Sequence, residues 1–157
     1  MILTQNHSDS VKLVLNVMAG LDDALGNRSK LDSSMTSLEN LCGFSGESFR
    51  HFMNNMGSSH GLNYLEVGSY CGSTLFSLLY KNLDTVSKAY AIDNWSQFNE
   101  IGNPKEAFFK NKENFFPEGI PQLEVFERDC FNFDLSNIKE KINFYFYDGP
   151  HDEEEEE

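Results

Sequence analysis

Four short stretches of the sequence, each directly after a run of apolar residues, contain the side chains best suited to bind a ligand. These stretches are Glu66-Val67-Gly68, Asp93-Asn94-Trp95, Asp129-Cys130 and Asp148-Gly149-Pro150-His151. Carboxylates accept hydrogen bonds from hydroxyl and amino groups and stabilise nearby positive charge. Gly68 and Gly72 leave backbone N–H groups open to a ligand just before a predicted helix. The sequence therefore predicts a site for a nucleotide-like molecule.

The elements that position these stretches alternate between strand and helix from residue 63 onward. Strands are predicted over 64–67, 88–92, 123–128 and 142–147, and helices over 73–82, from Pro104 to just before Pro117, and over 136–141. Such alternation predicts an α/β fold with a parallel sheet, in which ligands bind beyond the carboxyl ends of the strands. The third strand has the alternation typical of an edge. The fourth strand is nearly all aromatic, so we expect it to be covered on both faces.

The first 60 residues predict a helical preface rather than a sheet. Helices are expected over 9–25, 37–42 and 46–56, with a polar stretch over 27–34. The first helix has an apolar face formed by Val11, Val14, Leu15, Met18 and Leu21. We expect the preface as a whole to pack against the rest of the protein, by capping the sheet or covering the ligand site, with dimerisation as the alternative. The chain thus divides into a cap region, 1–60, and a sheet domain, 61–157.

Composition narrows the possible partners and the compartment. The net charge of the 157 residues is -13, with only 12 basic side chains, which argues against binding to a nucleic acid backbone. The chain has neither a long apolar run nor a basic and apolar leader, so we expect a cytoplasmic protein that does not enter a membrane. Cys42, Cys71 and Cys130 form no C-x-x-C motif and are expected to be free thiols.

The spacing of the first stretch indicates which cofactor to expect. A dinucleotide fingerprint needs G-x-G-x-x-G, whereas this chain has Glu66-x-Gly68-x-x-x-Gly72-Ser73. That pattern resembles the first motif of class I S-adenosylmethionine (SAM) dependent methyltransferases. The resemblance extends from about residue 63 to the end through I-D-N-W (92–95), R-D-C (128–130) and Y-D-G-P-H-D (147–152). Within that class, the chain resembles more specifically the small-molecule methyltransferases that carry D-G-x-H after the fourth strand. The resemblance implies a Rossmann-like sheet of strand order 3-2-1-4, flanked by helices.

The resemblance also implies roles for individual residues. SAM would lie with its methionine near the stretch from Glu66 to Ser73, its ribose on Asp93 and its adenine near Trp95 and Asp129. The full set of cofactor-binding residues expected from it is Glu66, Gly68, Ser69, Tyr70, Gly72, Ser73, Asp93, Asn94, Trp95, Asp129 and Cys130. Burial of Trp95 as a loop anchor is an equally good interpretation.

The acceptor side of the site is expected at the end of the fourth strand. Asp148 and His151 are the candidates for a catalytic base acting on a small-molecule hydroxyl or amine. In related O-methyltransferases an acid at this place helps to hold a divalent metal, so Asp148 is also a tentative metal ligand. Hard cations need several oxygen ligands, however, and the remaining ones would lie beyond this sequence.

Two other functions stay open. A nicotinamide-dependent oxidoreductase would share the sheet and the acid after the second strand, although the glycine spacing counts against it. A non-catalytic domain that binds a nucleoside or a partner protein is the second. The sheet of the methyltransferase family has seven strands and this sequence stops after the fourth, so we expect a fragment of a longer chain. A homodimer is a further possibility, since an aromatic edge strand needs a cover.

Overall fold

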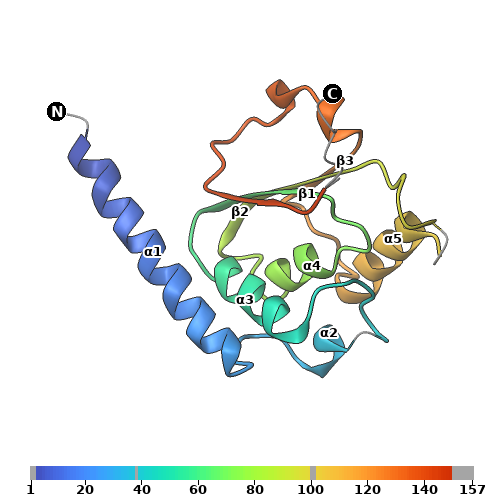
Figure 1. Ribbon diagram of the computed structural model, residues 1–157, viewed down its shortest axis with the longest axis horizontal. Coiled ribbons are helices and arrows are strands. Elements are labelled where there is room, and N and C mark those ends of the chain that lie inside the picture. The colour runs from blue at the N-terminus through green and yellow to red at the C-terminus, as the bar shows by residue number, and fades with distance from the viewer. Residues whose placement is uncertain (1–2, 38, 100–101, 150–157) are drawn as a thin grey trace, which may run out of the picture.

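A four-stranded parallel sheet of order β3-β2-β1-β4 forms the centre of the protein (Figure 1). The computed structural model describes residues 3–37, 39–99 and 102–149. The strands are β1 (Leu62–Val67), β2 (Val86–Asp93), β3 (Leu123–Glu127) and β4 (Phe144–Tyr147). Helix α4 (Ser73–Leu79) connects β1 to β2, and α5 (Pro104–Phe115) connects β2 to β3. The predicted α/β fold and strand order are confirmed.

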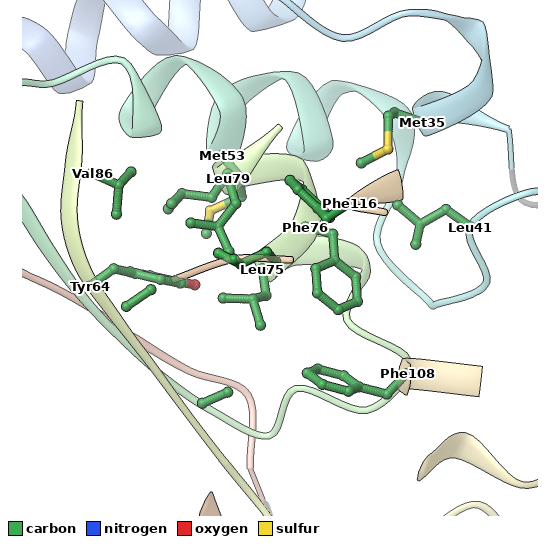
Figure 2. Close-up of a cluster of buried hydrophobic side chains, with 14 of the residues drawn as sticks. Met35, Leu41, Met53, Tyr64, Leu75, Phe76, Leu79, Val86, Phe108 and Phe116 are labelled. Carbon is green, nitrogen blue, oxygen red and sulfur yellow. The ribbon is translucent and has the colours of Figure 1, made fainter. Parts of the chain in front are cut away.

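The main core lies between one face of the sheet and the helices. Figure 1 shows α3 (Glu47–Gly57), α4 and α5 on the same side of the sheet. Figure 2 shows Tyr64 of β1 close to Leu75 and Phe76 of α4, with Phe108 of α5 beyond them. Met35, Leu41 and Met53 belong to the same buried cluster, so the N-terminal region and the sheet share one core.

The opposite face of the sheet has a thinner cover. Leu65 and Val67 of β1 and Tyr90 and Ile92 of β2 form a second buried cluster there, packed under segment 126–142. Tyr145 and Tyr147 on β4 point to this side and are 55% and 38% exposed. The prediction that the fourth strand is covered on both faces is therefore wrong, because these two side chains remain partly open to solvent.

Two short helices were predicted in the wrong places. The expected helix over 37–42 does not form at its described residues, 37 and 39–42. Helix α2 spans Ser33–Thr36 instead, because the Asp32 carboxylate accepts a hydrogen bond from the Ser34 N–H and starts the helix earlier. Ser37 is already extended. The expected helix over 136–141 is one 3₁₀ turn, Leu135–Asn137, capped by Asp134 in the same way. In both cases an aspartate side chain fixes the turn more strongly than the apolar spacing does.

Helix α1 (Leu3–Leu25) extends away from the sheet and contacts α3 through its C-terminal half (Figure 1). Val14, Leu15, Met18 and Leu21 are all at least half exposed, so the apolar face of this helix does not pack against the described part of the protein; the Val11 side chain lies outside the described residues. The contact with α3 uses Gly20 and Ala24 instead. Within the described ranges, no helix is long and apolar enough to cross a membrane.

The two faces of α1 should respond differently to the same substitution. We expect Ala24→Lys to lower the free energy of unfolding by about 3 kcal/mol, because Ala24 is 1% exposed and a lysine there forces a charge into the α1–α3 contact. Met18→Lys, on the exposed face, should change it by no more than about 0.5 kcal/mol. Urea denaturation of both variants measures the difference. Equal losses would contradict the observed orientation of α1.

Candidate functional site

The centre of the candidate site lies where the chain leaves β1 and β4, the point at which the strand order reverses. Gly68 has a φ of +84°, and a Cβ atom at this position would lie 2.1 Å from the carbonyl oxygen of Asp148. The Asp148 N–H donates to the Val67 carbonyl at 2.8 Å. Only glycine allows the two strand ends to come this close, so Gly68 sets the position of Asp148 at the site.

Asp93, at the end of β2, connects the glycine loop (residues 68–72) to the loop that follows β2. Its Oδ2 accepts from the Tyr70 N–H at 2.7 Å, and its Oδ1 accepts from the Trp95 N–H at 2.6 Å. Each carboxylate oxygen keeps a second lone pair for a ligand. The carboxylate thus orders both loops and still presents acceptor capacity between them.

A cavity opens between these strand ends, and it brings together residues from three of the four predicted stretches. Of the predicted site residues, its lining includes Gly68, Tyr70, Asp93, Asn94, Trp95 and Asp148. The lining also contains Gln97, Phe98 and Gly149. The last predicted stretch continues to His151, which lies outside the described residues.

A second, smaller hollow adjoins the first and is lined by the third stretch. It shares Gly68, Asp93 and Asn94 with the main cavity and adds Asp129 and Cys130. The Asp129 carboxylate accepts hydrogen bonds from the Phe131 N–H and the Asn132 amide, so it shapes its own loop. All four stretches therefore meet at one edge of the sheet, as the sequence predicted.

Trp95 is buried as a loop anchor. Its indole N–H donates to the Tyr70 carbonyl at 2.8 Å, and its ring packs edge-on against Phe108 of α5. Only 6% of the residue is exposed, and it lines the cavity from this buried position. The anchor interpretation of the sequence is thus the one that the structure supports, and contact with an adenine stays a prediction.

Glu66 is a fully buried carboxylate beneath the glycine loop. It accepts a hydrogen bond from the Tyr64 hydroxyl, and burial raises its pKa to about 7, while the nearby hydroxyls of Tyr64, Thr74 and Ser69 act in the opposite direction. Its Oε1 atom and the Ser69 hydroxyl are buried without a well-formed hydrogen bond in the described chain. These two polar atoms therefore retain capacity for a hydrogen bond, but neither residue lines the cavity or the smaller hollow.

The raised pKa of Glu66 predicts how stability changes with pH. Between its ordinary value of 4.5 and about 7, the folded protein holds a proton that the unfolded chain has lost. This contribution is complete below pH 4.5 and disappears as the pH rises through about 7. We expect the free energy of unfolding of the wild type, relative to Glu66→Gln, to fall by about 3 kcal/mol across that window. Urea denaturation in a pH series tests this, and parallel profiles would contradict it.

Two predicted cofactor residues have other contacts. Ser73, at the first position of α4, forms a hydroxyl–hydroxyl hydrogen bond with Ser45 at 2.9 Å and packs against Gly43. A Cβ atom on Gly72 would lie 2.2 Å from the Phe76 ring, so this glycine makes room for the core rather than for the cavity. Neither residue lines the cavity. Gly72 thus packs against the core, and Ser73 packs against the segment that contains Gly43 and Ser45.

Sequence reasoning missed two aromatic residues, Phe44 and Phe98, that pack around the predicted site residue Tyr70. Phe44 stacks on Tyr70 with ring centroids 5.2 Å apart, and Phe98 packs edge-on against both. Phe44 is 72% exposed and comes from the N-terminal region. Its only signal in the sequence is a large apolar residue in an otherwise small and polar stretch, Cys42 to Gly46.

The described residues contain no group of three or more histidine, cysteine, aspartate or glutamate side chains arranged to hold a metal ion. Asp148 is at the cavity, but the structure brings no second and third ligand to it within those ranges. Its role as a metal ligand stays a prediction.

Comparisons with known proteins give no relative for this chain. No protein-family model, no curated protein and no solved structure matches it. The residues and the geometry described above are therefore the basis for assigning a function.

Proposed function

We propose that the protein is a SAM-dependent methyltransferase that acts on a small molecule. The observation that carries the proposal is the position of Asp93. Its carboxylate lies at the end of β2, faces the glycine loop after β1, and lines the cavity at the point where the strand order reverses. A carboxylate so placed can accept hydrogen bonds from both hydroxyls of a ribose.

The residues around the cavity fit such a cofactor. Asp148, which lines the cavity, supplies a carboxylate for an ammonium or a sulfonium group. Phe98 and the edge of Trp95 supply apolar wall. When bound, SAM provides a methyl group on a positively charged sulfur, which a nucleophile displaces.

Catalysis of that displacement depends mainly on positioning. The glycine loop and Asp93 would hold the donor, and the aromatic group of Phe44, Tyr70 and Phe98 would exclude water at the mouth. Asp148 would accept a proton from a hydroxyl or ammonium acceptor. His151 keeps the same candidate role. We place this activity in the cytoplasm.

Calorimetric titration with S-adenosylhomocysteine, with NADH as the control ligand, tests the proposal. We expect micromolar affinity for S-adenosylhomocysteine and none for NADH. Binding of NADH alone would overturn the proposal in favour of an oxidoreductase, and binding of neither would overturn the cofactor assignment. Binding of S-adenosylhomocysteine without methyl transfer from SAM to any compound of an acceptor pool would favour the non-catalytic alternative.

A further inference from the structure

Cys42 and Cys71 come from distant parts of the chain and lie next to each other. Cys71 belongs to the glycine loop, and Cys42 belongs to the segment between α2 and α3. The Asn111 side-chain amide bridges them: it donates to Cys42 Sγ at 3.7 Å and to the Cys71 carbonyl at 3.0 Å. The Cys42 side chain lies near enough to the Cys71 thiol to contribute to its raised pKa. Both are free cysteines.

The environment of the two thiols is unequal. Cys71 is 4% exposed, and burial, together with the neighbouring Cys42, raises the pKa of its thiol. Cys42 is half-buried and therefore within reach of a reagent in solution. A thiolate, rather than a thiol, attacks a disulfide, so Cys42 is the better placed of the two to react first.

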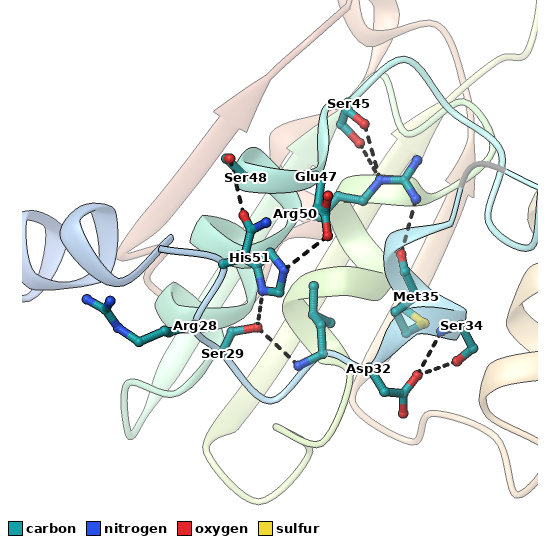
Figure 3. A network of polar contacts seen from close by, with 12 residues as sticks. Arg28, Ser29, Asp32, Ser34, Met35, Ser45, Glu47, Ser48, Arg50 and His51 are labelled. Carbon is teal, nitrogen blue, oxygen red and sulfur yellow. Dashed lines mark hydrogen bonds and ion pairs between the residues drawn. The ribbon is translucent and has the colours of Figure 1, made fainter. Parts of the chain in front are cut away.

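A buried cation, Arg50, lies in the same region as Cys42. The Arg50 guanidinium is fully buried, and it donates to the carbonyl oxygens of Met35 and Ser45 (Figure 3). Its Nη2 atom has no partner, and no carboxylate forms an ion pair with it among the described residues. Burial lowers the pKa of Arg50, and the strongest opposing charge is that of Cys42. Cys42 therefore lies close enough to the buried guanidinium for the two side chains to interact.

We propose that Cys42 and Cys71 form a redox-sensitive modification site, at which a small-molecule disulfide such as oxidised glutathione converts the two thiols into a disulfide bond. The Cys42 thiolate attacks one sulfur of the oxidant, forms a mixed disulfide and releases one glutathione thiolate. The Cys71 sulfur then gives up its proton and attacks Cys42 Sγ, and the second glutathione leaves. The protein loses two electrons and two protons, and the oxidant is reduced to two thiols.

The bond would fix the glycine loop to the N-terminal region at a place where the two are already in contact. Gly43 packs against Ser73, and Ser45 is hydrogen-bonded to it. Closure therefore needs no large movement of either segment. This inference concerns only the thiols and does not depend on the proposed methyltransferase function.

Peptide mapping of the full chain after treatment with oxidised glutathione tests the proposal. Trypsin places the three cysteines in separate peptides, 31–50, 51–81 and 129–139. We expect peptides 31–50 and 51–81 to be linked by a disulfide in the monomer, with peptide 129–139 unlinked. No linked pair, a pair that includes Cys130, or a link between two molecules would overturn the proposal.

Single substitutions test the order of the two attacks. Cys71→Ser should hold glutathione on Cys42 as a stable mixed disulfide, whereas Cys42→Ser should leave Cys71 unmodified because that thiol is buried. Cys130→Ser is the matched control and should still form the link. Glutathione on Cys71 in the Cys42→Ser protein would overturn the assignment of Cys42 as the attacking thiol.

Discussion

Replacement of Gly68 by alanine should cause the largest loss of stability of any single methyl group added at the site. Gly68 combines a left-handed φ of +84° with close packing, because an added Cβ would lie 2.1 Å from the Asp148 carbonyl oxygen and 2.8 Å from the Gly149 nitrogen. The left-handed conformation alone costs about 1–2 kcal/mol for an L-residue. The overlap with backbone atoms adds to this, because β4 must move away from β1. We expect a total loss of about 4 kcal/mol in the free energy of unfolding.

The chain offers a matched control for this prediction. Gly119 has the same φ of +84°, but nothing lies within 4 Å of a Cβ built there. Gly119→Ala should therefore lose only the conformational part, about 1–2 kcal/mol. Urea denaturation of the two variants separates the overlap from the backbone strain. Equal losses would show that Gly68 is not required for the approach of the two strand ends.

The sheet and the place of the site could be predicted because their signals are local. Each strand is a short apolar run, and each run ends at an acid or a glycine. Parallel strands gather those ends at one edge, so Glu66, Asp93, Asp129 and Asp148 were expected together without knowledge of any long-range contact. The linings of the two cavities contain Asp93, Asp129 and Asp148 in agreement with that expectation, whereas Glu66 is buried and belongs to neither lining.

The spacing of glycines could not assign their separate roles. Gly68 and Gly72 both adopt positive φ angles, and both were predicted to leave backbone N–H groups open to a ligand. The structure distinguishes them by their neighbours, the backbone of Asp148 in one case and the ring of Phe76 in the other. Asp148 is far from Gly68 in the sequence, and Gly72 meets the side chain of Phe76 rather than its backbone. The glycine motif contains no information about either neighbour.

Amphipathic patterns showed which faces are apolar but not what covers them. The pattern of α1 is regular, yet its contact with α3 uses Gly20 and Ala24 rather than the large apolar side chains. All four residues of β4 are aromatic, so the sequence does not show which of them face the core. Phe144 and Phe146 do, whereas Tyr145 and Tyr147 do not. Which part of the protein covers the apolar face of a helix or a strand depends on tertiary structure.

Phe44 and Phe98, which pack around the predicted residue Tyr70, were missed for a related reason. Phe44 and Tyr70 are far apart in the sequence and meet because Gly43 lets the segment after α2 lie against Ser73. Phe98 has a φ of +59°, a conformation that is uncommon for a non-glycine residue. Neither the spacing nor the residue type indicates such a conformation.

Removal of the Asp93 carboxylate should weaken binding of S-adenosylhomocysteine by about 100-fold. A hydrogen bond from a ligand hydroxyl to a carboxylate contributes about 1.5–3 kcal/mol, and Asp93→Ala also releases the Tyr70 and Trp95 N–H groups that the carboxylate holds. The affinity loss of this variant alone does not separate ribose recognition from loop positioning. The 2′-deoxy analogue of the ligand does, because it lacks one of the hydroxyls at issue.

The two ligands and two proteins form a cycle that measures the contact itself. We expect the wild type to bind the deoxy analogue about 10- to 100-fold more weakly than S-adenosylhomocysteine, and Asp93→Ala to bind both with equal, low affinity. Asp134→Ala is the control: its carboxylate also accepts a backbone N–H, from Ser136, but it lines neither cavity of the site. That variant should discriminate as the wild type does. If Asp93→Ala also kept the full discrimination, its carboxylate would position the loops and not bind the ribose.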